Sequence, residues 1–255
     1  MNLLQGKKIL ITRNATQAGS LKEQLIQLGA EVICIPTIQI VDPSSWQLFD
    51  QAAKKGFEFD WVVFTSVNAV LQTKKRLTEL SLDLNSKLKI AAIGDQTAKT
   101  IGDLGWKVDL VPDKYQAEDL GEKLIESGVK NKKIWLPRAL IARNILVEKL
   151  EQVGAGVALT PVYENNIPFE NRERLLSTLA KKEIDWITFT SASTVTHFFK
   201  IAGAELLGKP LPMLASIGEI TTKTLEKFSY QPVFTANPQN LAGLCQGIVN
   251  WESNL

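Results

Sequence analysis

The sequence predicts an α/β protein built from two similar, doubly wound parallel-sheet domains. The first observation is an internal repeat: residues 60–70 (DWVVFTSVNAV) return 125 residues later as residues 185–195 (DWITFTSASTV), with six of the eleven positions identical. The second is an alternation of short apolar runs with helix-length amphipathic segments, the order of parallel sheets with helices on both faces. A repeat of about half the chain suits one domain, and we expect the cleft between two such domains to hold the ligand.

Each expected strand is a short apolar run, and each expected helix shows apolar residues at helical spacing. In the first copy the strands are 9–12, 31–36, 61–64, 90–93 and 108–111, and the helices are 18–28, 66–80, 96–104 and 117–127. In the second copy the strands are 134–136, 157–159, 186–189, 213–217 and 233–235, and the helices are 142–153, 193–202, 221–228 and 241–249. Two polar or proline-bearing stretches, 39–45 and 163–171, each follow the first strand–helix–strand unit of their copy and are candidate linkers.

Composition excludes several classes of protein. The 255 residues are 45% hydrophobic and 22% charged, with a net charge of +2, which is ordinary for a soluble globular protein. No polybasic run supports nucleic-acid binding. Cys34 and Cys245 lie in apolar contexts without metal-ligand spacing and are interpreted as buried thiols. No signal peptide or membrane span is recognisable, so we expect a cytoplasmic protein that binds neither nucleic acid nor membrane.

In a doubly wound sheet, ligands bind beyond the carboxyl ends of the strands, and repeated polar residues fall there. Thr65-Ser66 and its copy Thr190-Ser191 stand where a strand ends and a helix begins. These hydroxyls can cap the helix, or they and the free N–H groups of its first turn can hold an anion. Duplication copies structural residues too, so capping alone remains an alternative.

Two further pairs occupy equivalent loops. Gly94 and Gly218 end a strand in a tight turn, with Thr97 and Thr221 in the helical turn that follows. Neither segment has the spacing of a phosphate loop, so nucleotide binding has little support. Arg13 and Arg138 follow the first strand of their copies, where arginine can bind carboxylates bidentately or can simply be a solvated loop charge.

Strong acid–base groups are few. Tyr163 lies where the second irregular stretch begins and could donate a proton or hydrogen bond, although packing is an alternative role. The single histidine, His197, stands beside two phenylalanines and is interpreted as a packed residue. No catalytic triad, carboxylate pair or metal cluster emerges. An enzyme of this composition would act by positioning its substrate and stabilising charge, without metal or cofactor.

Together these residues resemble uroporphyrinogen-III synthases. The matching segments follow one order along the whole chain: 9–13 (ILITR), 64–66 (FTS), 93–97 (IGDQT), 161–163 (PVY), 189–191 (FTS), 217–221 (IGEIT) and 233–244. Each motif alone is weakly specific, and their order and spacing carry the resemblance.

The resemblance implies two flavodoxin-like domains joined by a two-stranded connector. One would contain residues 1–37 and 168–255 and the other residues 38–167. It also implies a cofactor-free, cytoplasmic lyase of tetrapyrrole (heme and chlorophyll) biosynthesis, a monomer that can contact the preceding enzyme transiently. Its reaction removes water from hydroxymethylbilane, a linear tetrapyrrole, and closes the macrocycle with inversion of ring D.

The resemblance also assigns roles to single residues. Tyr163 matches a tyrosine thought to assist loss of the hydroxyl group. Five hydroxyl residues match cleft positions that would hold the eight carboxylates of the substrate: Thr65, Ser66, Thr97, Ser191 and Thr221. Some relatives carry a basic residue where this chain has Asn68, so that position has no expected role. A two-lobed protein that binds a small anion without chemistry is the alternative.

Overall fold

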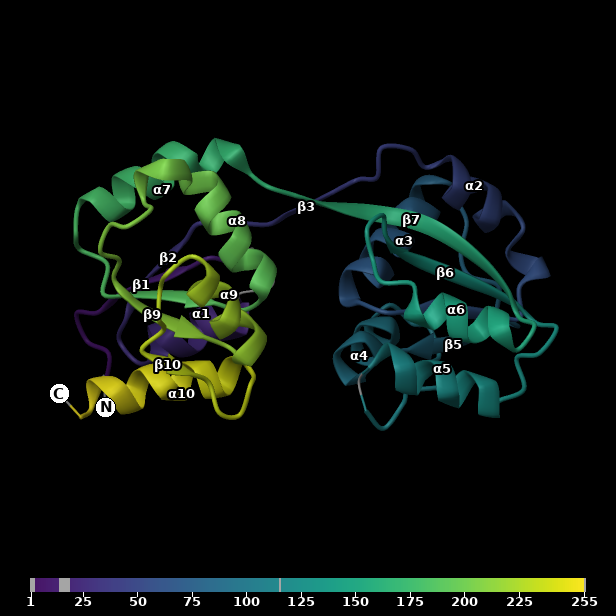
Figure 1. Ribbon diagram of the computed structural model, residues 1–255. Helices are drawn as coiled ribbons and strands as arrows, with labels where there is room; N and C mark the ends of the chain where they lie inside the picture. Colours follow the sequence, from purple (N-terminus) through teal and green to yellow (C-terminus); the bar gives the residue numbers. More distant parts are fainter. Residues whose placement is uncertain (1–2, 14–18, 115, 255) are drawn as a thin grey trace. The chain divides into compact units, whose positions relative to one another are not determined.

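The computed structural model describes residues 3–13, 19–114 and 116–254. The chain divides into two compact units, Met1–Gln39 with Asn166–Leu255 (unit 1) and Ile40–Asn165 (unit 2) (Figure 1). No helix in these described ranges combines the length and apolar character needed to cross a membrane.

Unit 1 contains a five-stranded sheet of order β10-β9-β8-β1-β2, with every pair parallel. Its strands are β1 (Lys8–Ile11), β2 (Glu31–Cys34), β8 (Trp186–Phe189), β9 (Met213–Ser216) and β10 (Phe234–Thr235). In chain order within the unit this is 2-1-3-4-5, the flavodoxin-like order.

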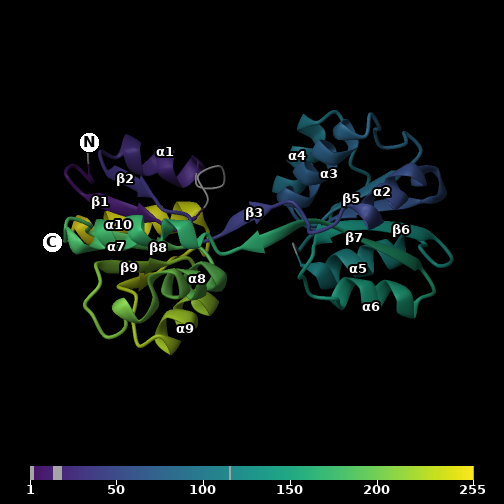
Figure 2. The ribbon, with the colours of Figure 1, turned by 90° about the horizontal axis from the view of Figure 1, so that it is seen from above.

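Helices cover both faces of this sheet (Figure 2). Helices α1 (Gly19–Gln27) and α10 (Leu241–Glu252) share a core with Ile9 and Ile11. On the other face, α7 (Arg172–Ala180), α8 (Ala192–Ala202) and α9 (Glu219–Lys227) share a core with Leu10. Successive β1 side chains thus enter opposite cores, as the alternation of a strand requires.

Unit 2 has the strand order β3-β7-β6-β4-β5, in which β7-β6-β4-β5 corresponds to β2-β1-β8-β9 of unit 1 and β3 is added at the edge beside β7. The strands are β3 (Gln39–Val41), β4 (Trp61–Phe64), β5 (Lys89–Ala92), β6 (Lys133–Ala139) and β7 (Gly156–Asn166). Helices α2 (Gln47–Lys54), α3 (Val67–Glu79) and α4 (Asp95–Asp103) pack on one face, and α5 (Ala117–Glu126) and α6 (Ile145–Gln152) on the other (Figure 2). Short 3-10 turns occupy Gly56–Glu58, Phe169–Asn171 and Gly203–Glu205.

Each sheet combines segments from both copies of the repeat. Strand β1, from the first copy, pairs with β8, from the second, with Ile9 opposite Trp186. In unit 2, β6 from the second copy pairs with β4 from the first, with Ile134 opposite Trp61. The first strand–helix–strand unit of each copy therefore completes the sheet of the other.

The structure differs from the sequence expectation in several segments. The strand expected at 108–111 is reduced to one bridge, between Leu110 and Ala91. The expected linkers are partly strand: β3 covers Gln39–Val41, and β7 runs through Pro161 to Asn166. The helix expected at 142–153 begins only at Ile145, because residues 140–144 form a loop. Helices α2 and α7 were not expected.

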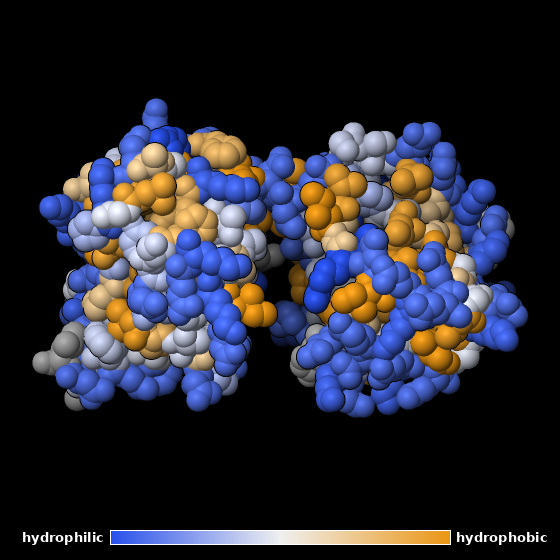
Figure 3. All heavy atoms as spheres, in the orientation of Figure 1, coloured by the Kyte–Doolittle hydropathy of each residue, from blue (hydrophilic) through white to orange (hydrophobic). Residues whose placement is uncertain are grey.

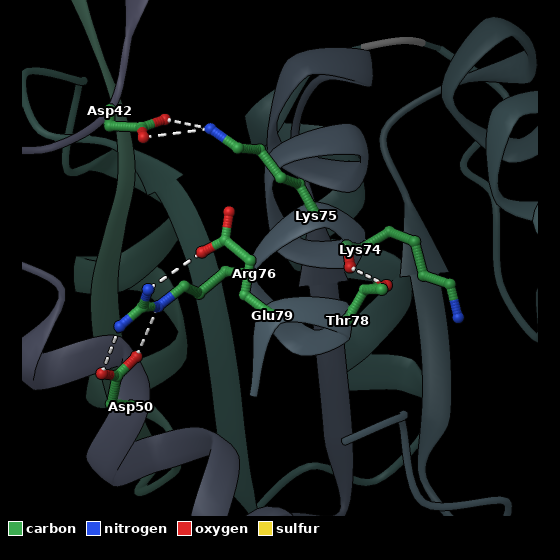
Figure 4. Close-up of polar contacts among 7 residues, drawn as sticks. All are labelled: Asp42, Asp50, Lys74, Lys75, Arg76, Thr78 and Glu79. Atoms are coloured by element: carbon green, nitrogen blue, oxygen red, sulfur yellow. Dashed lines mark hydrogen bonds and ion pairs between the residues drawn. The ribbon is translucent and has the colours of Figure 1, made fainter. Parts of the chain in front are cut away.

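Ion pairs fix α2 and the segment after β3 to α3 (Figure 4). The Arg76 guanidinium donates from Nε and Nη2 to the two carboxylate oxygens of Asp50 at 2.9 and 2.7 Å, and from Nη1 to Glu79 at 2.9 Å. Beside it, the Lys75 ammonium contacts both carboxylate oxygens of Asp42 at 2.8 and 3.0 Å. On the face drawn in Figure 3, hydrophilic side chains predominate and apolar ones form small patches among them.

Candidate functional site

The carboxyl ends of the unit 2 strands border a cavity of about 180 Å³. Two of the residues predicted for substrate binding, Thr65 and Arg138, line it, although they are 73 positions apart in the chain. They come together because β4 and β6 are neighbouring parallel strands that end at the same edge. The remaining lining residues are Ile93, Ala117, Leu136, Ala142, Arg143 and Leu146.

Ser66 stands beside Thr65 as the N-cap of α3. Its Oγ accepts the backbone N–H of Ala69 at 3.1 Å, which satisfies one donor of the first helical turn. The same Oγ lies 3.2 Å from the phenolic oxygen of Tyr163, and either oxygen can be the donor. Ser66 is therefore both a cap and the hydrogen-bond partner of the predicted catalytic residue.

Tyr163 lies on β7, and its side chain is 7% exposed. It faces Ala139 across the sheet, next to a shift in register between Arg138 and Ala139. Such a bulge re-aims side chains at the end of a strand. Sequence reasoning placed Tyr163 in a hinge; the structure places it inside a strand, against the unit 2 core.

Arg138 binds the loop that follows it. Its Nη1 donates to the carbonyl of Arg143 at 3.1 Å, and its Nη2 donates to Asn144 Oδ1 at 2.8 Å. Partial burial lowers the pKa of the guanidinium below its ordinary value, but an arginine stays charged at neutral pH. The cation is thus held at the cavity by neutral acceptors, which leave its charge uncompensated.

The glycine–threonine pairs stand where α4 and α9 begin. Gly94 and Gly218 are the N-caps of α4 and α9, each with φ of −178°, so their backbone is extended and imposes no need for glycine. Thr97 and Thr221 are buried. A direct binding role for these threonines stays a prediction.

At Gly218 a Cβ would lie 2.5 Å from Oε1 of Gln239, the flexible end of a side chain in the loop between β10 and α10, and would displace this amide. Sequence reasoning missed Gln239 because no motif marks it. Its amide lies beside Gly218 at the carboxyl edge of the unit 1 sheet.

Ser191 and Arg13 occupy the same edge of unit 1. Ser191 caps α8 in a reciprocal capping box with Thr194, and its Oγ also lies 3.0 Å from Ser193 Oγ. Burial lowers the pKa of Arg13, and its buried Nε lacks a hydrogen-bond partner. Residues 14–18, which follow Arg13, lie outside the described ranges.

His197 is a half-buried residue of α8, and its Nδ1 lies 3.1 Å from the carbonyl of Thr37, so this nitrogen donates the bond. Burial lowers its pKa below the ordinary value of 6.5. Within the described ranges, no group of three or more His, Cys, Asp or Glu side chains could hold a metal ion.

Known proteins match this chain along nearly its whole length. A family model described as Uroporphyrinogen-III synthase HemD matches residues 19–246. The chain belongs to this family. The Uroporphyrinogen-III synthase of Synechococcus elongatus is 32% identical over 256 residues, which covers 97% of this chain and 96% of that protein. A Putative uroporphyrinogen-III synthase of Methanothermobacter thermautotrophicus is 32% identical over 225 residues, with coverage of 85% and 88%.

Solved structures of the family share the fold. A mutant uroporphyrinogen III synthase from Thermus thermophilus superposes with a TM-score of 0.65 at 17% identity and covers 98% of this chain and 100% of its own. The Helicobacter pylori uroporphyrinogen-III synthetase gives 0.63 at 17% identity, with coverage of 96% and 99%. The two flavodoxin-like sheets described above are therefore the fold of uroporphyrinogen-III synthases.

Proposed function

We propose that this chain catalyses the reaction of its family, the cyclisation of hydroxymethylbilane to uroporphyrinogen III with loss of water and inversion of ring D. The observation that carries the proposal is the Ser66–Tyr163 hydroxyl pair in unit 2, at the strand edge where Arg138 and Thr65 line a cavity. A phenol beside an uncompensated cation suits a substrate that has a hydroxyl leaving group and many carboxylates.

The hydrogen bonds of Ser66 indicate where Tyr163 can donate its proton. Because Ser66 Oγ already accepts the Ala69 N–H, its own O–H is free to donate to the phenolic oxygen. The O–H of Tyr163 is then free to donate to the hydroxyl group of the substrate. As the C–O bond breaks, that hydroxyl takes the phenolic proton and leaves as water, and a protonated azafulvene and the Tyr163 phenolate remain.

Ring closure would follow without another acid from the protein. The proton that the ring D carbon releases as the macrocycle closes would return to the Tyr163 phenolate. The substituted carbon of ring D attacks the azafulvene to give a spiro intermediate, which fragments and recloses with ring D inverted. Carboxylates of the substrate would be held at the two sheet edges by Arg13 and Arg138 and by the strand-end hydroxyls of Thr65, Ser66 and Ser191. Behind these residues, the proposed binding sites also include Gly94, Thr97, Gly218 and Thr221. Many modest anion sites suit an octacarboxylate better than one strong site.

The same proposal extends to organisation and setting. We assign residues 1–37 and 168–255 to one domain and residues 38–167 to the other, in a cytoplasmic monomer that needs no cofactor and contacts the preceding enzyme only transiently. Light scattering on the purified protein checks the monomer.

The decisive assay uses freshly prepared hydroxymethylbilane, with the isomers of the product separated chromatographically. The type III isomer should form faster than the spontaneous type I isomer. Type I alone, at the spontaneous rate, would refute the activity and favour a two-lobed binding protein for a small anion.

A further inference from the structure

The loop between β6 and α6, residues 140–144, presents apolar side chains to solvent at the candidate site. The side chain of Ile141 is 88% exposed and that of Leu140 is 43% exposed. Among the large hydrophobic side chains of the described ranges, none is more exposed than Ile141. One exposed aliphatic residue is ordinary on a protein surface, so the meaning of this one depends on its surroundings.

The loop is held in place by bonds at both ends. The backbone N–H of Leu140 donates to the carbonyl of Tyr163 at 2.9 Å. At the other end, Arg138 binds the Arg143 carbonyl and the Asn144 side chain, as described above. Ile141 therefore lies in a loop that is held by hydrogen bonds at both ends. The backbone of its first residue is hydrogen-bonded to the backbone of the predicted catalytic tyrosine.

A charged side chain, Arg143, lies in the same loop as Leu140 and Ile141. Arg143 is exposed and lines the cavity together with Arg138. Within the described part of the chain, its guanidinium makes no ion pair or hydrogen bond. Ile93, Leu136 and Leu146 supply an apolar wall in the same cavity. Two cations, Arg138 at the end of β6 and Arg143 in the loop, lie beside exposed aliphatic side chains, and this suits a ligand that has an apolar ring and carboxylates attached to it.

We propose that this loop binds one carboxylated pyrrole ring of the linear tetrapyrrole, with Leu140 and Ile141 against the ring face and Arg143, beside Arg138, on its carboxylates. The proposal rests on the function proposed above and adds Leu140, Ile141 and Arg143 as positioning residues. None of them is expected to take part in proton transfer. A pyrrole with acidic side chains has the apolar face and the negative charge that the loop complements.

Steady-state kinetics with hydroxymethylbilane test the loop through kcat/KM. Ile141→Gln should lower kcat/KM about fivefold, because one aliphatic contact with the ring is lost. Arg143→Gln should lower it about tenfold, because a charge-assisted hydrogen bond is lost, and Arg143→Lys should recover part of this loss. Neither change removes a buried group, so thermal unfolding should stay at the parent temperature.

Matched controls exist in the same unit. Leu71→Gln replaces an aliphatic side chain on α3 that is 47% exposed, and Lys130→Gln removes an exposed cation near the opposite end of β6. The kcat/KM of both control variants should stay within twofold of the parent.

Added salt distinguishes the ionic contribution of Arg143 from the apolar contribution of Ile141. Arg143→Gln should make kcat/KM fall less steeply with added NaCl, and Ile141→Gln should leave the steepness of that fall unchanged.

The outcomes distinguish the two levels of the proposal. A parent protein that makes the type III isomer, with Ile141→Gln and Arg143→Gln within twofold of it, overturns the loop assignment alone. A parent that makes no type III isomer overturns the proposed function and the loop assignment with it. Losses equal to those of Leu71→Gln and Lys130→Gln would also overturn the loop assignment.

Discussion

Asp60 and Asp185 occupy equivalent positions before β4 and β8, and both have a structural role. The Asp60 carboxylate accepts the backbone N–H of Lys133 at 2.9 Å, and the Asp185 carboxylate accepts that of Lys8 at 2.7 Å. Each ties the starts of two neighbouring strands together, at the edge of the sheet opposite the candidate site. Duplication has thus copied structural residues as faithfully as strand-end hydroxyls, and repetition alone cannot identify a binding residue.

The Asp60 carboxyl makes stability depend on pH. Burial raises its pKa, but the Lys133 N–H and the Lys132 ammonium offset this, and the net pKa lies below the ordinary 3.8. A lowered pKa in the folded state stabilises the protein above pH 3.8, and this contribution is lost as the pH falls through the folded-state pKa. Asp60→Asn should therefore lower stability at pH 7 by about 0.5–1 kcal/mol, because the ion pair is solvent-exposed and an amide oxygen can still accept the N–H.

Thermal unfolding at pH 7, pH 4.5 and about pH 3 measures this effect. The difference in unfolding temperature between the parent and Asp60→Asn should persist at pH 4.5 and become smaller at the lowest pH. A gap that is constant over the whole range would show that the charge of Asp60 contributes nothing.

Tyr163→Phe separates packing from proton donation. The ring can still pack in the unit 2 core, while the phenolic oxygen 3.2 Å from Ser66 Oγ is removed. General acid assistance is worth about 10²–10⁴-fold, and because this leaving group ionises readily by itself we expect a fall in kcat of at most about 10²-fold. The type III isomer should remain the main enzymic product, because isomer choice would depend on how the substrate is held.

Tyr230→Phe is the matched control for that measurement. Its hydroxyl donates to the carbonyls of Leu206 and Lys209 in unit 1, at 2.6 and 2.9 Å, away from the candidate site. It should lower stability and leave kcat near that of the parent. An unchanged rate in Tyr163→Phe would remove the acid role, and mainly type I product would show that the phenol also controls isomer choice.

Among the elements, the strands and helices of the two repeats could be predicted from the sequence because their apolar periodicity is strong. The polar stretch at 39–45 could not be recognised as containing β3, since a three-residue strand carries no periodicity. The strand expected at 157–159 is longer in the structure: β7 passes through Pro161 to Asn166, with Val162 as the extra residue at the register shift. Helix α7 buries only Leu175 over its nine residues, which is too little apolar pattern to detect.

At the site, the strand-end positions could be predicted and the contacts could not. The order of parallel strands is enough to bring Thr65 and Arg138 to one edge. The Ser66–Tyr163 hydrogen bond depends on β7 continuing past Pro161, and the approach of Gln239 to Gly218 depends on a loop without a motif. Thr97 and Thr221 are buried because the helix face that carries them packs on the sheet. Their position one turn after a glycine does not indicate which face of the helix that is.

One strong ion pair joins α2 to α3, and a weaker one joins the segment after β3 to α3. The Arg76 guanidinium binds Asp50 bidentately, the two side chains are 21% and 24% exposed, and Arg76 also lies 5.1 Å over the ring of Trp46. Arg76→Ala should lower the free energy of unfolding by about 1–2 kcal/mol. Lys75→Ala, which removes the half-exposed pair with Asp42, should lower it by less than about 1 kcal/mol. Urea unfolding measures both, and equal losses would contradict the distinction.

For the whole molecule, the sequence repeat leaves strand pairing ambiguous. Residues 61–64 and 186–189 share one pattern, so either could lie beside β1 with the same register. The structure selects Trp186 as the partner of Ile9 and Ile134 as the partner of Trp61, so each copy gives its first strand–helix–strand unit to the other sheet. Folding unit 1 thus requires segments from both ends of the chain, whereas unit 2 is one continuous segment.

This asymmetry predicts that residues 40–165 fold alone. The two hydrophobic clusters of unit 2 consist only of residues from this segment, and the clusters of unit 1 contain none of them. A segment of about 125 residues is a common size for an independent domain. The isolated fragment should show the helix and strand content of unit 2 and unfold cooperatively with heat, measured by circular dichroism. Residues 1–39 alone should stay unfolded, because β1 then lacks β8, its partner in the sheet interior. A fragment 40–165 without a cooperative transition would show that unit 2 needs unit 1 to fold, despite its separate core.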